Sequence, residues 1–489
     1  MTVTADRASP QSNALILCLP AALGLAVYVM LMWPSLMDQP EPSFGDMIYN
    51  YYFLSIVEGR FDVPARIVSS EGLYAPDGTA YVNQGLAPLL TRILAAPFVD
   101  LREVSLAGVS VLLFAAIGSA AMQVTAVNIL TRFGPEAQDM RRPLLVLAGL
   151  AAWLASPGPT LASNESLYHE PIAAAYAAGA LWMAFAARVV VFGDRPGKWL
   201  LPMALAAGIM VHAREHLAVG LYAGTVLFGL WDLKAGGWNR LPHVAFAMAV
   251  LFAFGAALLG MNQARFGSLL RSSGVEWGFS YWNLYTEEHA RIAYNTNSAG
   301  AFHPARVPGN ALLYFLDLPK DLGIYDLGPL NRRLTMAWGW VGIESPRFGV
   351  VFAWAPWFLV TLRGLFCRSG VARAGWVLVA AGSVGALVVM SFATLTLRYR
   401  VDLWPLVMAG AVLMLPRIAA GIRDGRIAVR SAVRAGGLAL LLACGVQFTV
   451  LPYGILEWDE RGVWSEAQCA EYARAKGFDA DAVARICAL

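Results

Sequence analysis

The sequence predicts an all-α polytopic membrane protein with about eleven transmembrane helices. Hydrophobic residues make up 58% of its 489 residues, and charged residues only 14%. The mean hydropathy is +0.55, above what a water-soluble protein of this size needs. The formal net charge is +3, and the basic residues are spread over short loops. Nucleic acid is therefore not expected as a partner, and membrane lipids are.

The first apolar segment, residues 13–33, is about twenty residues long, enough to cross the ~30 Å hydrocarbon core of a bilayer. It runs into Pro34 and Asp38 rather than into a small-residue cleavage site, which predicts an uncleaved anchor. The other predicted spans are residues 104–130, 143–156, 171–192, 199–212, 215–231, 243–262, 347–366, 374–394, 401–417 and 435–451.

The charges of the short loops predict the orientation. With a cytoplasmic N-terminus, every short inside loop is cationic, as the positive-inside rule requires. Those loops carry Arg132, Arg141, Arg142, Arg195, Lys198, Lys234, Arg240, Arg363, Arg368, Arg373, Arg417, Arg423, Arg426, Arg430 and Arg434. The expected organisation is a transmembrane module over residues 1–451, with outer loops 34–102, 156–170 and 263–346, and a small outer tail over residues 452–489.

The two long outer loops are rich in aromatic residues, which predicts that they are folded. In the first loop, residues 49–60 have the pattern of an interfacial amphipathic helix. Cys469 and Cys487 share the outer tail, the side on which thiols can oxidise. They form either a disulfide or two reduced cysteines in a frayed tail.

Two acids stand at the starts of outer-face helices. Asp46 leads the helix of the first outer loop, where it is either a catalytic carboxylate or a helix cap. Glu170 precedes Pro171 at the mouth of an apolar helix, a position that the helix dipole also favours for an acid. Both acids are candidate catalytic residues, each with a structural alternative.

Ionisable residues also interrupt the apolar pattern at two other points. Residues 212–216 include Arg214 between two histidines, at a depth where charges usually line a polar cavity. This turn predicts an internal ion pair or a phosphate site, because no third metal ligand accompanies the histidines. Arg398 and Arg400 lie on the face where basic residues are otherwise scarce. Either Asp402 pairs with Arg398, four residues earlier, or the two arginines hold an anionic ligand.

Several of these segments, in the same order, resemble membrane glycosyltransferases of the GT-C class, in particular the bacterial family related to protein O-mannosyltransferases and lipid A aminoarabinose transferases. The resemblance covers most of residues 14–410. The chain departs from it at Met47, where many relatives have a second acid. The motifs that carry the resemblance are Gly45-Asp46, Tyr49, Gly59, Gly72-Leu73-Tyr74, Gly78 to Tyr81, Ser156-Pro157, Tyr168-His169-Glu170, Arg265-Phe266-Gly267, Ser345 to Gly349, and Arg398-Tyr399 with Asp402 and Pro405.

The resemblance implies a glycosyltransferase in the bacterial inner membrane, with its active site and C-terminus on the periplasmic or extracellular side. A sugar carried on polyprenyl phosphate would pass, usually with inversion, to a glycan, lipid or protein acceptor. Asp46, or else Glu170, would be the general base. Donor-phosphate binding falls to Arg398, Arg400, Arg214 and Arg265, and substrate binding to His169, Tyr49, Tyr81 and Tyr399.

No cofactor is predicted, and a divalent metal requirement stays open. Three alternatives remain at this point. A transporter or flippase of lipid-linked sugars would also have many helices, although it should place polar groups near mid-membrane and show broken helices in both halves. An oligosaccharide ligase or oligosaccharyltransferase is closer within the enzymes. A noncatalytic membrane scaffold would explain the departure at Met47.

Overall fold

The computed structural model describes residues 10–37, 45–75, 77–82, 85–270, 302–318, 325–338, 342–343, 347–366, 374–456, 463–475 and 477–488. Most of these residues are helical, and each strand among them is two residues long. The predicted all-α class is therefore confirmed. Residues 271–301 of the large outer loop, with Trp277, Tyr281 and Trp282, lie outside the described residues.

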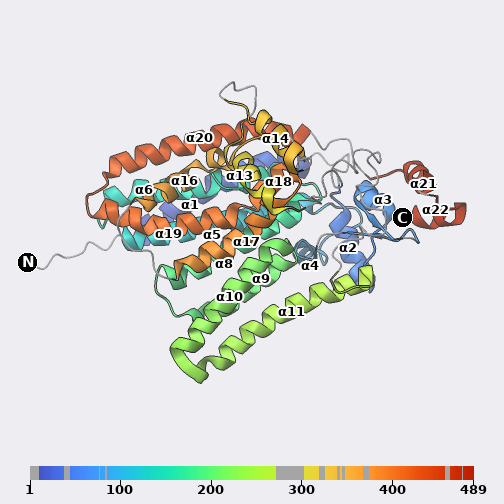
Figure 1. The fold of residues 1–489 in the computed structure, drawn as a ribbon, viewed down its shortest axis with the longest axis horizontal. Helices are drawn as coiled ribbons and strands as arrows, with labels where there is room; N and C mark the ends of the chain where they lie inside the picture. The colour runs from blue at the N-terminus through green and yellow to red at the C-terminus, as the bar shows by residue number, and fades with distance from the viewer. Residues whose placement is uncertain are drawn as a thin grey trace, which may run out of the picture.

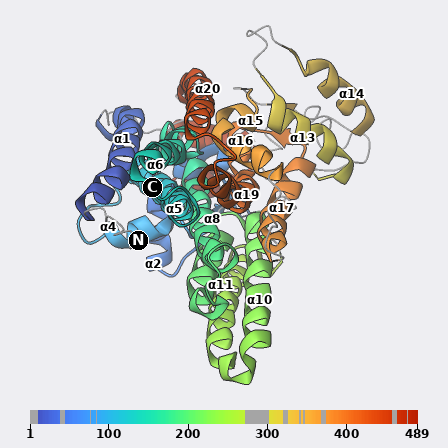
Figure 2. The same cartoon turned by 90° about the vertical axis from the view of Figure 1, so that its left-hand side faces the viewer.

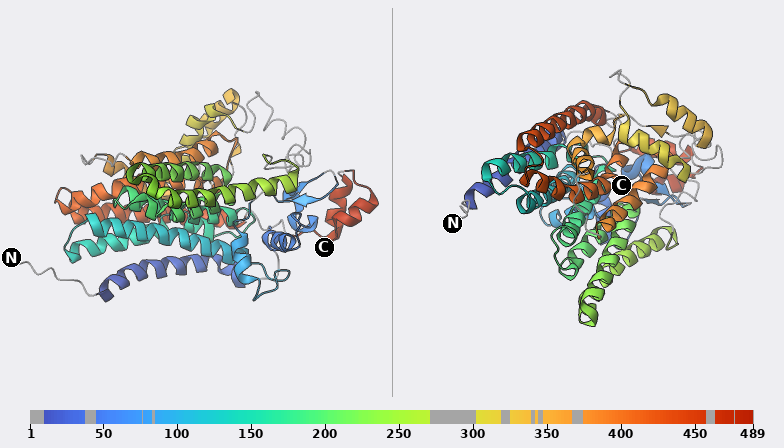
Figure 3. Two further views of the ribbon diagram at one scale, coloured as in Figure 1. Left: turned by 90° about the horizontal axis from the view of Figure 1, so that it is seen from below. Right: turned by 60° about the vertical axis from the view of Figure 1, so that its left-hand side comes forward.

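Long helices form an elongated bundle. They are α1 (Pro10–Met37), α5 (Ala107–Phe133), α6 (Gln138–Leu154), α8 (His169–Val190), α9 (Leu200–Val211), α10 (Glu215–Gly236), α11 (Leu241–Phe266), α16 (Ala355–Leu365), α17 (Gly375–Ser391), α19 (Trp404–Arg423) and α20 (Val429–Leu456). The N-terminus lies at one end of this bundle and the C-terminus at the other (Figures 1 and 3).

Shorter elements connect these helices. They are α2 (Ile48–Val57), α3 (Ala65–Val68), η1 (Ser69–Glu71), β1 (Leu73–Tyr74), β2 (Ala80–Tyr81), α4 (Leu89–Ala95), α7 (Gly158–Ala162), η2 (Pro196–Lys198), η3 (Gly237–Arg240), η7 (Pro304–Arg306), α13 (Val307–Leu316), α14 (Gly328–Trp338), β3 (Gly342–Ile343), α15 (Val350–Ala353), β4 (Thr394–Leu395), α18 (Leu397–Val401), α21 (Glu466–Ala475) and α22 (Ala480–Ile486). Strands β1 and β2 pair antiparallel, with Leu73 opposite Tyr81, and β3 pairs parallel with β4.

Five helical stretches in the described residues are long and apolar enough to cross a membrane. This is the composition of a multi-pass membrane protein, and the predicted count of about eleven crossings stays a prediction. The five stretches are Ala107–Phe133, His169–Val190, Glu215–Phe266, Leu397–Arg423 and Val429–Thr449, and shorter apolar helices cover Cys18–Trp33, Leu200–Val211 and Gly375–Ser391. The long stretch Glu215–Phe266 contains both α10 and α11, which extend away from the other helices (Figure 2).

Helix α8 lies in the centre of the bundle and positions the candidate site. Its alanine-rich surface is buried, and it packs along α5. At Gly118 of α5, an added Cβ would lie 2.4 Å from the ring of Tyr176. Small residues of this kind let membrane helices approach closely. The first residues of α8, His169 and Glu170, are therefore fixed at the end of the bundle that faces α2 and α4.

The first outer loop and the C-terminal tail form one packed layer at that end. Tyr49 and Tyr52 of α2 share a buried apolar cluster with Leu167 and with the two cysteines of the tail. Arg66 and Trp464 join the loop to the tail through two 3.0 Å hydrogen bonds. Cys469 and Cys487 form a disulfide, which is the oxidised alternative considered from the sequence.

Removing this disulfide is expected to loosen the tail without unfolding the bundle. Cys469→Ser with Cys487→Ser opens a crosslink between residues 18 apart. Chain-entropy arguments give such a loop about 3 kcal/mol. Limited proteolysis should then cleave the double variant between α21 and α22 faster than the wild type. Equal protection of the two proteins would contradict a stabilising role for the disulfide.

Most of the described residues between α11 and α17 are helical. Arg347, which precedes α15, forms a two-point ion pair with the buried Asp317 at 2.8 and 2.9 Å. The predicted span 347–366 is divided at Trp354 into α15 and α16, because Pro356 in the second position of α16 cannot continue a preceding helix.

Candidate functional site

Asp46 stands at the entrance to α2, directly against the loop that precedes α8. Gly45 adopts a φ of +71°, and an added Cβ there would lie 2.7 Å from the Cβ of Leu167. Glycine meets both requirements because it tolerates positive φ and has no side chain. Met47 occupies the N-cap of α2, and no side chain caps that helix. The carboxylate of Asp46 is therefore not used as a helix cap.

The environment of Asp46 favours its protonated form. The residue is 5% exposed, and Oδ1 has no hydrogen-bond partner among the described residues. Burial raises the pKa of Asp46 from 3.8 to about 7, with a further upward contribution from the negative charge of Glu165. Hydrogen bonds from Ser105 and the backbone of Met47 act in the opposite direction. A carboxylate with a pKa near 7 is suited to accept a proton at neutral pH.

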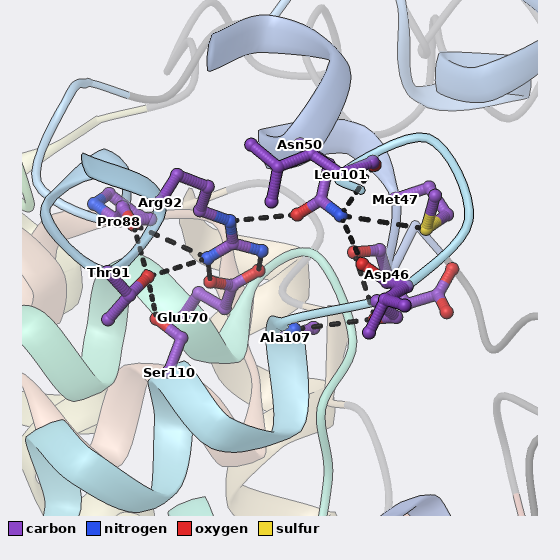
Figure 4. A network of polar contacts seen from close by, with 12 residues as sticks. Asp46, Met47, Asn50, Pro88, Thr91, Arg92, Leu101, Ala107, Ser110 and Glu170 are labelled. Atoms are coloured by element: carbon purple, nitrogen blue, oxygen red, sulfur yellow. Dashed lines mark hydrogen bonds and ion pairs between the residues drawn. The ribbon is translucent and has the colours of Figure 1, made fainter. Parts of the chain in front are cut away.

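Glu170 is engaged by Arg92 of α4 in a fully buried ion pair (Figure 4). The two terminal nitrogens of Arg92 donate to the two carboxylate oxygens, Nη2 at a distance of 3.0 Å. Arg92 Nε donates to Asn50 Oδ1 at 2.9 Å, and Asn50 Nδ2 donates to the carbonyls of Leu101 and Val104. Both oxygens of Glu170 are thus occupied, and the network joins α2, α4 and α8.

The loop before α8 supplies further polar groups. Tyr168 donates its hydroxyl hydrogen to the Glu71 carboxylate. His169 Nδ1 lies 2.9 Å from Ser166 Oγ, and the His169 side chain is buried. Glu165, also buried, acts electrostatically on Asp46. The second outer loop therefore lies beside the carboxylate of Asp46 in the first outer loop.

A cluster of cations lies on the other side of this loop. We call Arg398 and Arg214 the arginine pair. The guanidinium carbon of Arg398 is 4.0 Å from the centre of the Tyr168 ring. Arg214 and Arg398 lie 5.3 and 5.7 Å from the ring of Tyr399. Their positive charges both act on His169. The arginine pair and Tyr399 are thus brought together next to His169, as a phosphate site requires.

Asp402 neutralises part of this charge. Its two oxygens lie 3.7 Å from Arg214 Nε and 3.2 Å from His216 Nε2. The sequence raised a pair between Asp402 and Arg398, four residues apart on one segment. The structure places Asp402 against the turn between α9 and α10 instead, which attaches that turn to the start of α19.

Arg400 and Arg265 are oriented toward the backbone. Arg400 Nε donates to the carbonyl of Phe348 at 2.7 Å, and its Nη1 donates to that of Thr396 at 2.9 Å. Arg265 Nη1 donates to the carbonyl of Val82 at 2.5 Å. Both side chains are nearly inaccessible, so these contacts position loops around the site. A direct role of either residue in donor binding stays a prediction.

Tyr49 lies beside the buried ion pair, with its ring centre 5.7 Å from the guanidinium carbon of Arg92. Its side chain is fully buried, and its hydroxyl has no hydrogen-bond partner among the residues that the structure describes. Burial raises the pKa of Tyr49 well above its ordinary value, with Glu170 adding to the rise and Arg92 and Arg214 opposing it. Tyr81 of β2 lies farther out, partly exposed, with its ring 5.9 Å from that of Phe266.

The two histidines of the 212–216 turn serve separate contacts. His212 Nε2 lies 3.1 Å from the carbonyl of Phe254, whereas His216 faces Asp402. The carbonyl of His212 accepts a hydrogen bond from Ala87 N at 3.0 Å. Across the described part of the chain, no group of three or more His, Cys, Asp or Glu side chains is placed to hold a metal ion.

Three polar residues of this site were not selected from the sequence. Arg92 is the lone cation in the apolar segment Leu89–Ala95, a signal for a buried partner. Asn50 lies in an aromatic helix, and Glu165 lies in a short polar loop where acids are common. Only the position of Arg92 carried a sequence signal, because the roles of the other two depend on which loops meet.

No protein-family profile matches the chain, and no curated protein matches its sequence. Among solved structures, the fold is similar to that of the apo form of the Archaeoglobus fulgidus oligosaccharyltransferase, with a TM-score of 0.47 and 12% sequence identity. The match covers 97% of this chain and 59% of that enzyme, so this chain spans less than two thirds of its length.

Proposed function

We propose that the protein is a membrane glycosyltransferase that moves a sugar from a polyprenyl-phosphate donor to an acceptor hydroxyl. One observation carries this proposal: a buried carboxylate with an unpartnered oxygen and a pKa of about 7, Asp46, lies at the same end of the bundle as the arginine pair. The proposed membrane is the bacterial inner membrane, with this end on the periplasmic or extracellular side. The acceptor class is a cell-envelope glycan, lipid or protein.

Asp46 is the proposed general base. In the transfer step, the acceptor oxygen attacks the anomeric carbon and its proton passes to Asp46, while the bond from that carbon to the phosphate oxygen breaks. Inversion follows from a single displacement of this kind. Burial keeps the free carboxylate poorly solvated, which strengthens it as a proton acceptor.

The arginine pair is the proposed site for the donor phosphate. The leaving group departs as an anion, so it requires fixed positive charge and no proton. Arg398 and Arg214 supply two guanidinium groups, and Tyr399 and Tyr168 provide aromatic faces beside them. Glu170 has a positioning role in this proposal because both of its oxygens bind Arg92.

Arg398→Gln is expected to weaken donor binding by about ten- to a hundredfold, the value of one charge-assisted hydrogen bond. The matched control is Arg60→Gln, since Arg60 lies at the same end of the protein, is half exposed and pairs with Glu58 and Asp62. Binding of a radiolabelled polyprenyl-phosphate sugar to purified protein measures both. Unchanged affinity in Arg398→Gln would remove Arg398 from the donor site.

A donor panel tests the function itself. Membranes containing the wild type or Asp46→Asn are incubated with a series of radiolabelled polyprenyl-phosphate sugars, and loss of sugar from the lipid is measured. We expect the wild type to consume at least one donor and Asp46→Asn to consume none. If no donor is bound or consumed by the wild type, the transferase proposal fails and a transporter or scaffold role takes its place.

A further inference from the structure

The aromatic and cationic side chains beside His169 form a chain of contacts. Arg398 lies over the ring of Tyr168, with its guanidinium carbon 4.0 Å from the ring centre. The corresponding distances to the ring of Tyr399 are 5.7 Å for Arg398 and 5.3 Å for Arg214. The contact between Arg398 and Tyr168 is therefore the shortest of the three.

A carboxylate lies at each end of this chain of contacts. At one end, the hydroxyl of Tyr168 donates a hydrogen bond to Glu71. At the other end, Asp402 Oδ1 lies 3.7 Å from Arg214 Nε. Burial, together with the negative charge of Glu71, raises the pKa of Tyr168 well above its ordinary value, so the hydroxyl stays protonated and continues to donate. The hydroxyl thus fixes the direction of the Tyr168 ring, and the face of that ring contacts Arg398.

Glu71 is itself held in place by an unusual turn. Among the described residues, Ser69 is the only one other than glycine with a positive φ, at +46°, and it is buried. Such a conformation costs energy and persists only where the surrounding contacts hold it. The hydroxyl of Tyr74 donates to the carbonyl of Ser69 at 2.7 Å, and Glu71 follows two residues later at the end of η1.

The Tyr168 ring can stabilise a guanidinium group that a neighbouring arginine repels. A cation over the face of a tyrosine ring is attracted by the negative charge of that face. The contact also restricts a long, flexible side chain before a ligand arrives. A group that is already ordered loses less conformational entropy on binding, so it binds an anion more tightly.

We propose that Tyr168 is a positioning residue of the donor-phosphate site. Its ring holds the guanidinium group of Arg398 in the orientation that receives the phosphate, and Glu71 fixes the ring through the hydroxyl. Tyr168 acts through Arg398 and makes no contact of its own with the phosphate. This inference rests on the proposed function, because it concerns the same phosphate site.

A double-mutant cycle on ligand binding tests this inference. The probe is radiolabelled polyprenyl phosphate, which carries the anion that Arg398 is proposed to hold, and its use does not depend on the identity of the sugar. Its dissociation constant is measured for the purified full-length wild type, Tyr168→Leu, Arg398→Gln and the double variant. Tyr222→Leu is the matched control, since Tyr222 of α10 is also partly buried and donates its hydroxyl hydrogen to one acceptor, the carbonyl of Leu251 at 3.2 Å.

Tyr168→Leu is expected to weaken binding about five- to thirtyfold, as expected for loss of a partly desolvated cation–π contact. Tyr168→Phe keeps the ring and should recover most of the affinity, and Tyr222→Leu should bind as the wild type does. In the Arg398→Gln background, Tyr168→Leu should weaken binding by less than about twofold further. The reason is that a residue acting only through Arg398 has no effect once Arg398 is removed.

Three results would overturn the positioning role. One is wild-type affinity in Tyr168→Leu, and another is equal weakening in Tyr168→Phe and Tyr168→Leu. The third is a double variant in which the two losses add in full, because Tyr168 would then act independently of Arg398. Absence of binding by the wild type would instead remove the donor-phosphate site itself, and the inference with it.

Elution volume and thermal unfolding check that each variant is folded. If Tyr168→Leu does not fold, Tyr168→Met takes its place in the cycle, because methionine fills an irregular gap and provides no ring. The same losses and the same lack of additivity are expected for that variant.

Discussion

Asp46→Asn is expected to lower the turnover number by about 10²- to 10⁴-fold, the usual contribution of a general base. Donor binding should persist, because the arginine pair is unchanged. Asparagine has nearly the same shape as aspartate, but its amide cannot take the proton from the acceptor hydroxyl. Turnover of a radiolabelled donor at saturating concentration measures the loss, and the donor dissociation constant is measured on the same preparation.

The wild type should show the matching pH dependence. Asp46 must be deprotonated to act, and its pKa is about 7. The turnover number should therefore level off above about pH 8, be half-maximal near pH 7, and be about a hundredfold lower at pH 5, since each pH unit well below the pKa reduces the deprotonated fraction tenfold. The residual rate of Asp46→Asn should lack this step. An unchanged pH profile in the variant would assign the base to another residue.

As the pH rises, the stability of the wild type should fall while its activity increases. The pKa of Asp46 is higher in the folded protein, about 7, than its ordinary value of 3.8. Burying the charged form therefore destabilises the protein progressively from pH 3.8 to 7, by up to about 4 kcal/mol above pH 7. Asp46→Asn should unfold at a higher temperature than the wild type at pH 8, and the difference should shrink by more than half at pH 5.

Arg92→Met is expected to destabilise the protein by about 3–5 kcal/mol, because it leaves Glu170 charged and unpaired in a buried site. Glu170→Gln should also destabilise, since Arg92 then loses its charge partner. Both side chains of this ion pair are 0% exposed. Replacing both residues together, Arg92→Met with Glu170→Met, should recover part of the loss because no isolated charge remains. Thermal unfolding in one detergent at one pH compares the variants.

The control for this pair is again Arg60→Gln, which removes a half-exposed arginine and should change stability by less than about 1 kcal/mol. If Arg92→Met and Arg60→Gln change the stability by the same small amount, the buried ion pair does not stabilise the site. Measuring activity and stability together also distinguishes the roles of Asp46 and Glu170. Asp46→Asn should lose activity and gain stability at pH 8, whereas Glu170→Gln should lose both.

The sequence predicted the helices well because apolar segments of membrane length are a strong signal. Each predicted span coincides with a helix or, at residues 347–366, with two. The helix of the first outer loop was also expected, and it is α2. The number of crossings was harder to predict, since several apolar helices, such as Leu200–Val211, are shorter than a bilayer requires.

The candidate site was only partly predictable. Asp46, His169 and Arg398 stood out because charged or polar residues at the ends of apolar helices are unusual. The pairings within the site were not predictable, because they depend on contacts between distant segments. Arg92 and Glu170 are separated by 78 residues, and His216 and Asp402 by 186. The local pattern offered only Arg398, four residues away, as a partner for Asp402, with an anionic ligand as the alternative.

The most direct test of the account follows donor binding and product formation in one sample. Purified wild type and Asp46→Asn are each mixed with a donor that the panel identifies, and bound donor and released polyprenyl phosphate are both quantified. We predict equal donor binding by the two proteins, with polyprenyl phosphate formed only by the wild type. Equal release of polyprenyl phosphate by both proteins would contradict the role of Asp46, and absence of donor binding in both would contradict the transferase itself.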